Sequence, residues 1–501
     1  MMNLLERQII RLLEGAGSLL SHRKRPGQNS QSRDKLLLSQ ANSLYQPKRK
    51  EDIYLSTQER LQHLYILGAT GSGKTKLIEF LIRQDILSGR GFCLIDLHGD
   101  LYQNILKFLG GLLLQGDSCR IAKHIRNKLV LIEPSNLKWT VGFNPLEAEN
   151  INHYTQTLEF MGIFRKLWAD AHWGPRMEEL LRNTLTTLSL NGLTLLEAKA
   201  LLTDSAFRGQ LVASMSPTET KEYWLYRYNQ LSEKMQATYR EPILNRLSIF
   251  ISDPFIRSIV GQIKSTVDFR KTMDQGKWLL VNLSKGQLKG NASLLGALII
   301  AKLQLSALSR VDLPEERRAP FFLFVDEFQN FLGDDFETIL SEARKYGLGL
   351  VLAHQNIDQL DRQLRSAILG NTLTQVFFRL SSQDATALSS ELSQREKPII
   401  QRRLIDLKVG EAYLKKKGER PRLMKTIIVS KPEATAKAVE IVKTLSFSLH
   451  GRQRQEVEEE LARRAKIIYS IGQTEKVGSS QSDSYTGQFA PEGEVEEAHA
   501  W

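Results

Sequence analysis

The sequence predicts an α/β fold with a mostly parallel central sheet and an inserted all-α domain. Two observations lead to this prediction. Short apolar runs, typical of buried strands, alternate with helical patterns in residues 51–150 and again in residues 272–450. In residues 151–271, between these two parts, apolar residues recur only at helical spacing. Strands that alternate with helices pair in parallel through right-handed crossovers, so we expect the two outer parts to share one sheet.

The first core part, residues 51–150, follows a segment of different texture. Residues 21–50 are rich in Ser, Gln, Arg and Lys, so we predict that residues 1–50 form a basic N-terminal helix and arm. From residue 61 onward, apolar strands alternate with helices. Strands are expected at residues 64–67, 92–95 and 129–132, and helices after residue 75 and over 101–109.

The insertion, residues 151–271, carries helix signals and no strand pattern. Apolar residues between Met177 and Leu188 follow helical spacing. Thr194 to Glu197 and Ser216 to Glu219 both match a capping box, the second with proline at the first helical position. We therefore expect an all-helical domain.

The second core part, residues 272–450, returns to alternating strands and helices. After it, residues 451–501 are predicted to hold a charged helix over 453–466 and a disordered, polar and acidic tail over 470–501. Within the core part, strands are expected at residues 278–283, 321–325, 348–353 and 375–379, and helices over 292–308 and 336–346.

The composition excludes several classes of protein. With 42% hydrophobic and 25% charged residues, the chain is typical of a globular protein of two or three domains. Apolar runs such as residues 294–301 are too short to cross a membrane, so no transmembrane helix is expected. Two cysteines, Cys93 and Cys119, do not form a disulfide framework, which indicates a reducing cytoplasm.

Positive charge is concentrated at the N-terminus. The net charge is +12, and residues 1–50 hold ten Lys and Arg against three acids. Such an excess favours a polyanionic partner, either nucleic acid or an anionic membrane surface. The alternative is a solvated, flexible arm.

The segment GATGSGKT matches the phosphate-binding pattern G-x-x-x-x-G-K-[ST], with a strand before it and a helix after it. Its glycines allow backbone amides to surround phosphate oxygens at the positive end of a helix. We expect Lys74 to reach the β- and γ-phosphates and the Thr75 hydroxyl to ligate Mg²⁺. The predicted nucleotide-binding residues are Gly68, Ala69, Thr70, Gly71, Ser72, Gly73, Lys74 and Thr75.

A second strand supplies the acids that this site needs. The apolar run at residues 321–325 ends in Asp326 and Glu327. We expect Asp326 to hold Mg²⁺ and Glu327 to orient or deprotonate the attacking water. The two motifs together predict a RecA-like P-loop NTPase that hydrolyses ATP with Mg²⁺.

Polar residues near other strands are weaker candidates. Gln355 follows the strand at 348–353, where an amide could sense the γ-phosphate. Arg344 is either an active-site arginine or a cation favoured at the C-terminus of a helix. Asp96 and His98 end the second strand, and either approach the nucleotide or form a polar turn.

Several segments follow one another along the chain: GATGSGKT, LIDLHGDL, VGFNPLE, WGPRMEELLRNTL, LLVNLSKG, FFLFVDEFQNF, SEARKYGLGLVLAHQ and ILGNTLTQVFFRLSSQDA. Their order resembles that in the type IV coupling-protein-like ATPases of the HerA–FtsK superfamily. The resemblance covers residues 51–464, and its most specific parts are the DLHGD turn and SEARKYGLGLVLAHQ.

This resemblance implies a homohexameric ring that hydrolyses ATP and translocates DNA during conjugation or mobilisation. By position, Arg344 matches the arginine finger of the family, which reaches a neighbouring subunit, and Gln355 matches its sensor glutamine. Residues 151–271 match the all-alpha domain, where relaxase complexes and DNA meet the ring. Relaxase and secretion-channel partners are implied in the same way.

The sequence also departs from the family. Membrane-bound members carry N-terminal transmembrane helices, which are not expected here, and the family's Asp-Pro-His turn is Asp96-Leu97-His98. The expected location is cytoplasmic, with peripheral contact to the inner membrane face as an alternative. The basic amphipathic start, residues 1–25, either lies on such a surface, packs on a neighbouring subunit, or is disordered.

Two other functions remain open. The chain could energise a type IV secretion apparatus with protein cargo, and then DNA would not stimulate turnover. It could instead be a low-turnover adaptor that docks a relaxosome to a channel, and then Glu327→Gln would leave function intact.

Overall fold

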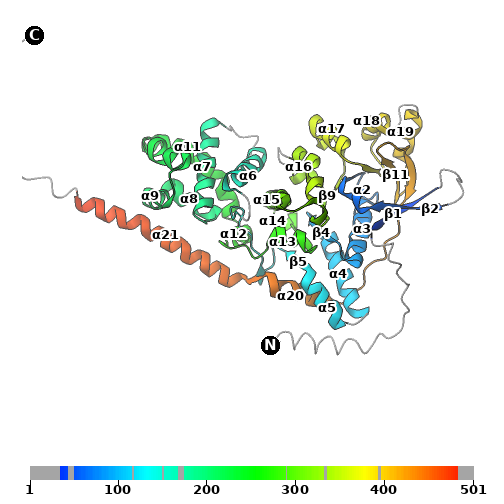
Figure 1. Ribbon diagram of the computed structural model, residues 1–501, viewed down its shortest axis with the longest axis horizontal. Coiled ribbons are helices and arrows are strands. Elements are labelled where there is room, and N and C mark those ends of the chain that lie inside the picture. The colour runs from blue at the N-terminus through cyan, green and yellow to red at the C-terminus, as the bar shows by residue number, and fades with distance from the viewer. Residues whose placement is uncertain are drawn as a thin grey trace, which may run out of the picture.

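The computed structural model describes residues 34–42, 50–115, 118–148, 152–167, 174–288, 290–331, 336–392 and 396–482. The predicted N-terminal helix and the part of the arm in residues 1–33 and 43–49 lie outside the described residues. A sheet with helices on both sides forms one body, and a lobe of helices lies beside it, with the long helix α21 running along the lobe (Figure 1).

Within the described residues, the central sheet has eleven strands in the order β2-β1-β12-β11-β10-β3-β9-β8-β4-β7-β5. Neighbouring strands from β10 to β5 run parallel, whereas β11, β12, β1 and β2 pair antiparallel. This confirms the predicted mostly parallel sheet. The strands are β1 Lys35–Asn42, β2 Lys50–Ser56, β3 Leu64–Leu67, β4 Gly91–Asp96, β5 Leu129–Ile132, β7 Trp278–Asn282, β8 Phe321–Asp326, β9 Leu348–His354, β10 Thr374–Phe377, β11 Glu411–Lys416 and β12 Arg422–Lys425.

The parallel strands are buried along almost their whole length; the exception is Asp326 at the end of β8, which is half-buried. Every residue of β3, β4, β5, β7, β9 and β10 is buried. Strands covered by helices on both faces have continuous apolar runs instead of alternation, which is why these segments could be found from the sequence. The helices around the sheet are α2 Thr57–Leu61, α3 Lys74–Ser88, α4 Asp100–Gln115, α5 Ser118–Lys128, α13 Phe269–Asp274, α14 Lys285–Leu288, α15 Asn291–Leu308, α16 Phe336–Glu342, α17 Arg362–Asn371, α18 Ser382–Leu392, α19 Lys397–Asp406 and α20 Ala436–His450.

Among the described residues, one helical stretch, Asn291–Asp312, is long and apolar enough to cross a membrane. In this fold 83% of its most apolar window is buried inside the protein. It contains α15, in which Leu295, Leu298 and Leu303 are fully buried. A helix that is apolar on all sides is typical of the core of a large domain.

The lobe between β5 and β7 is helical, as the sequence predicts. Thr194 and Glu197 form the expected capping box. The second capping box is wrong, because the Thr218 side chain caps the helix that begins at Glu219, two residues beyond the expected start at Pro217. The lobe contains α6 His153–Leu167, α7 Pro175–Leu190, α8 Ala198–Thr203, α9 Ser205–Ser214, α10 Glu219–Glu222, the π-helix Tyr223–Tyr228, α11 Glu233–Ile251 and α12 Pro254–Val260.

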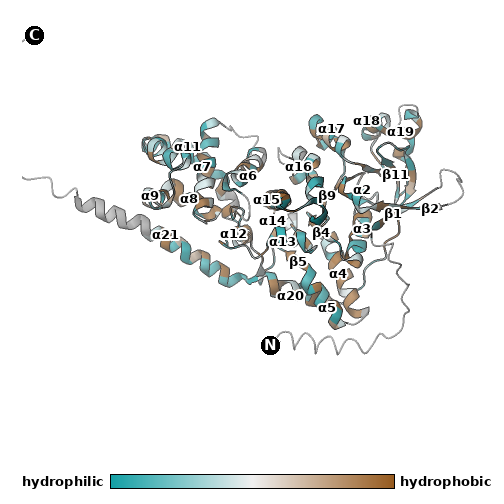
Figure 2. Cartoon of the chain, in the orientation of Figure 1, coloured by the Kyte–Doolittle hydropathy of each residue, from teal (hydrophilic) through white to brown (hydrophobic). Residues whose placement is uncertain are grey.

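Two segments differ from the sequence prediction. Residues 35–42, assigned to the arm, form strand β1, which pairs with β2 and with the distant β12. Residues 470–482, assigned to a disordered tail, continue α21, Arg454–Ser482. The part of α21 that is coloured in Figure 2 is mostly hydrophilic with hydrophobic bands. Its Arg464 donates to the Gly261 carbonyl and pairs with Glu197 in the lobe. Long-range pairing therefore orders residues 35–42, and the contacts of Arg464 fasten α21 to the lobe.

Candidate nucleotide-binding site

The glycine-rich turn at residues 68–73 connects β3 directly to α3, which begins at Lys74. Gly73 has a φ of 120°, which side chains disfavour. Gly68 has no room for a side chain, because an added Cβ would lie 2.5 Å from Cβ of Phe378. The turn therefore requires glycine for two different reasons, conformation at one position and close packing at the other.

Lys74 lies over the turn that precedes it. Its Nζ donates to the carbonyl oxygen of Gly68 at 2.5 Å, and the residue is 6% exposed. Burial lowers the pKa of Lys74, and this effect is opposed by the negative charges of Asp326 and Glu327. The ammonium group and the two acids therefore belong to one electrostatic cluster.

Thr75 and Asp326 bring two hard oxygen donors together. The Thr75 hydroxyl donates to Oδ2 of Asp326 at 3.0 Å. Burial, and then the charge of Glu327, raise the pKa of Asp326 to about 6. Hydroxyl and carboxylate oxygens are ligands that Mg²⁺ accepts, and Mg²⁺ is usually held by one or two such groups together with phosphates and water. The donor set therefore fits the predicted metal.

Glu327 begins a sharp turn after β8. Its φ of 53° is uncommon for a residue with a side chain, and its amide donates to Oδ1 of Asp326 at 3.0 Å. Two amides hold its carboxylate: Gln355 donates to Oε1, and Gln329 donates to Oε2 at 2.7 Å. The carboxylate is thus held in one orientation by two donors.

Gln355 links this acid to the glycine-rich turn. While its Nε2 donates to Glu327, its Oε1 accepts from the Thr70 hydroxyl at 2.7 Å. The link is possible because β9, which ends just before Gln355, lies between β3 and β8 in the sheet. The residues predicted for nucleotide and metal are therefore brought together at the carboxyl-terminal ends of the parallel strands.

Asp96 and His98 lie at the same ends of the strands, at the end of β4, which is the strand next to β8. The Asp96 carboxylate accepts from the backbone amides of His98 and Tyr102, at 3.0 and 2.8 Å. These bonds favour the polar-turn interpretation, because the carboxylate caps the start of α4. The His98 side chain is exposed.

Arg344 does not join the other site residues. It precedes β9, whereas Gln355 follows it, so the two lie at opposite ends of a seven-residue strand. Such a strand spans about 20 Å. The Arg344 side chain is exposed. Within one chain it lies at the amino-terminal ends of the parallel strands, whereas the glycine-rich turn lies at their carboxyl-terminal ends.

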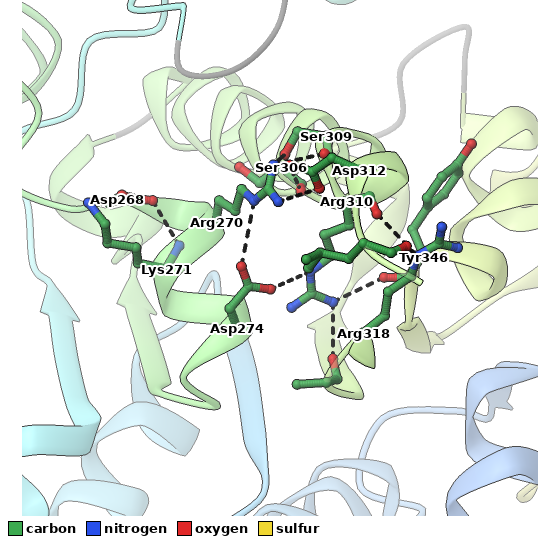
Figure 3. Close-up of polar contacts among 12 residues, drawn as sticks. Asp268, Arg270, Lys271, Asp274, Ser306, Ser309, Arg310, Asp312, Arg318 and Tyr346 are labelled. Carbon is green, nitrogen blue, oxygen red and sulfur yellow. Dashed lines mark hydrogen bonds and ion pairs between the residues drawn. The ribbon is translucent and has the colours of Figure 1, made fainter. Parts of the chain in front are cut away.

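The backbone of the turn that carries Arg344 is held by hydrogen bonds from two other arginines (Figure 3). The fully buried Arg310 donates from Nη1 to the carbonyls of Tyr346 and Ala319, each at 3.0 Å, and pairs with Asp274 at 2.9 Å. Arg318 donates to the carbonyl of Lys345 at 2.5 Å. The backbone that presents Arg344 is therefore held by two cations from the segment before β8.

His63 ties the same region to β9. Its Nε2 lies 3.0 Å from the Leu340 carbonyl, and its Nδ1 accepts from the Leu350 amide at 3.0 Å. Burial lowers the pKa of His63 to about 4. A neutral ring, protonated on Nε2, satisfies both bonds.

Three contacts at the site were not expected from the sequence. The first is the bond from Gln329 to Glu327. In the second, the Ala69 amide donates to the carbonyl of Arg379 at 2.8 Å, and in the third the amide of Gly410 donates to the Ser72 carbonyl at 2.9 Å. The Arg379 side chain is exposed beside the turn. Its place at a strand end could have drawn attention to it, whereas neither Gln329 nor Gly410 carries a local signal.

The fold, and the residues gathered at the carboxyl-terminal ends of its parallel strands, define the class of protein: the chain is a RecA-like P-loop NTPase. Two family models match it, the central domain of helicase HerA over residues 44–284 and the TraM recognition site of TraD and TraG over residues 320–402. Both matches support a type IV coupling-protein-like ATPase, in agreement with the resemblance found in the sequence.

Solved structures share its fold. Plasmid coupling protein TrwB in complex with ADP and Mg²⁺ is similar with a TM-score of 0.54 and 18% identity, covering 78% of this chain and 89% of that one. VirB4 of Thermoanaerobacter pseudethanolicus is similar with a TM-score of 0.50 and 14% identity, covering 81% and 99%. Comparison with curated proteins found no match.

Proposed function

We propose that the chain is an ATP-hydrolysing, ring-forming DNA translocase of conjugation or mobilisation. The observation that carries the proposal is the continuous contact from Thr70 through Gln355 to Glu327, beside the Thr75–Asp326 pair. It joins the phosphate-binding turn to an oriented acid. A site that only binds nucleotide does not need such an acid.

In this mechanism, Glu327 accepts the proton of the water that attacks the γ-phosphate in line. Gln355 keeps the carboxylate facing the phosphates, and Lys74 stabilises negative charge on the transferring group. Thr75 and Asp326 would hold Mg²⁺, which supplies further charge neutralisation when it is bound.

The position of Arg344 supports a ring. An arginine at the opposite ends of the strands from its own site cannot reach that site, but it can complete the site of a neighbouring copy, and a closed ring satisfies every copy in the same way. We propose a homohexamer with Arg344 acting in trans, a cytoplasmic location with peripheral contact at the inner membrane face, and relaxase and secretion-channel partners. Nucleic acid would be bound mainly through its backbone, assisted by the basic residues 1–50.

The test is the rate of ATP hydrolysis by the full chain, alone and with single- or double-stranded DNA, with the oligomeric state measured by mass photometry in the same buffers. We expect DNA-stimulated hydrolysis that Lys74→Ala abolishes, together with hexamers. Turnover that DNA does not change would favour protein cargo. Function that survives Glu327→Gln would favour the low-turnover adaptor.

A further inference from the structure

The glycine-rich turn has two flanks. On one flank β9 and β8 bring Gln355, Asp326 and Glu327 to the turn. On the other flank lies β10, followed in the sheet by β11. A bound triphosphate with its γ-phosphate beside the acids must direct its other end, the nucleoside, away from them. The flank of β10 and β11 is therefore where a nucleoside would emerge.

Two loop segments occupy that second flank, residues 408–411 before β11 and 426–430 after β12. The Gly410 amide donates to the Ser72 carbonyl at 2.9 Å, and the Thr426 amide donates to the Gly410 carbonyl at 2.8 Å. Arg83 on α3 donates to the Ser430 carbonyl at 3.0 Å. Both segments are thus fastened to the phosphate-binding turn or to the helix that follows it.

Each segment exposes one branched apolar side chain. Val409 is 66% exposed and Ile428 is 89% exposed, whereas the neighbouring Leu407 and Met424 are buried. Single exposed apolar residues are ordinary on a protein surface. These two differ in their position, because hydrogen bonds join their segments to each other and to the phosphate-binding turn.

We propose that Val409 and Ile428 form the nucleobase subsite of this NTPase, in contact with the faces of the purine ring. The inference rests on the proposed function, since it requires a nucleoside triphosphate at the glycine-rich turn. A planar aromatic ring is the ligand that two apolar side chains can cover most favourably. Neither side chain has a polar atom, so this contact holds the ring without reading its edges.

The test compares two probes on the full chain by isothermal titration calorimetry: Mg²⁺–ATP, and Mg²⁺ with inorganic tripolyphosphate, which has phosphates and no nucleoside. The variants are Val409→Ser and Ile428→Ser. Ile399→Ser is the matched control, because Ile399 is also an exposed isoleucine, 55% exposed on α19. We expect each subsite variant to raise the Kd of ATP about tenfold by removing apolar contact, and to leave the Kd of tripolyphosphate unchanged. The control should change neither value.

Other outcomes overturn the inference in distinguishable ways. An unchanged Kd of ATP in both variants would place the base elsewhere. Equal weakening of ATP and tripolyphosphate would mean that these residues only support the phosphate-binding turn. If the unmodified chain bound neither probe, the proposed function itself would fail, and the subsite with it.

Discussion

Replacing Gln355 by leucine removes a side chain that contacts both the phosphate-binding turn and the predicted catalytic acid. In the folded chain its amide donates to Oε1 of Glu327 and accepts from the Thr70 hydroxyl. Leucine has a similar size and cannot make either bond. Gln329 still donates to the other carboxylate oxygen, so the acid stays partly held but loses its link to the nucleotide.

The expected magnitude follows from the lost bond to a charged group. Such a bond contributes about 1.5–3 kcal/mol. If this energy orients the acid mainly in the transition state, kcat should fall about 10- to 150-fold. The KM and the Kd of ATP should stay within about threefold, because Lys74 and the backbone of the turn are unchanged. Steady-state ATPase assays and calorimetry measure these quantities.

Gln383→Leu is the matched control for this experiment. The Gln383 amide donates to the exposed carboxylate of Asp358 at 2.6 Å, which is the same chemistry in a pair that includes neither Glu327 nor the phosphate-binding turn. Its loss should leave kcat unchanged. Full kcat in Gln355→Leu would show that this bond does not orient the acid. A rise in the Kd of ATP as large as the fall in kcat would show that Gln355 only shapes the phosphate-binding turn.

Three further predictions follow from the charges. Arg344→Ala should lower kcat about 10³-fold with near-normal ATP binding, and mixing it with Glu327→Gln subunits should restore part of the hydrolysis. The pKa of Asp326 is raised to about 6. Its contribution to the stability of the folded chain is therefore complete below about pH 4 and is lost as the pH rises through about 6. Asp326→Asn should accordingly raise the Tm of the metal-free chain by about 3 °C at about pH 7.5 and leave it unchanged at about pH 4. Asp274→Ala leaves the buried guanidinium of Arg310 without its ion-pair partner and should lower the free energy of unfolding by about 3 kcal/mol in a denaturant titration.

Each of these predictions has a contrary outcome. Loss of ATP binding in Arg344→Ala would place that arginine in its own subunit's site. Mg²⁺ should raise the Tm of the unmodified chain and not that of Asp326→Asn, and equal effects would place the metal elsewhere. Asp312→Ala is the control for Asp274→Ala, because it removes an exposed partner of Arg270 in the same cluster (Figure 3). The unfolding midpoint of the Asp312→Ala chain should equal that of the unmodified chain. A loss as large as that of Asp274→Ala would show that burial does not explain the effect.

Much of the fold could be predicted from the sequence because its strands are buried on both faces. The run at residues 64–67 coincides with β3, and the run at 129–132 coincides with β5. Strand β1 was missed because it belongs to the antiparallel edge of the sheet, where its pairing with β12 depends on contacts such as Ser39 with Met424, 385 residues apart. Local periodicity carries no information about such a partner.

The sequence by itself determined the phosphate-binding turn, the acids after β8 and the class of chemistry, because each depends on residues adjacent in the chain. Only the tertiary structure decided how they meet: the Thr75–Asp326 bond closes a separation of 251 residues, and the Thr70–Gln355 bond one of 285. It also decided that Gln329 and Gly410 contact the site, and that Arg344 lies on the far edge. Strand order and strand direction set these positions, and both are properties of the whole sheet.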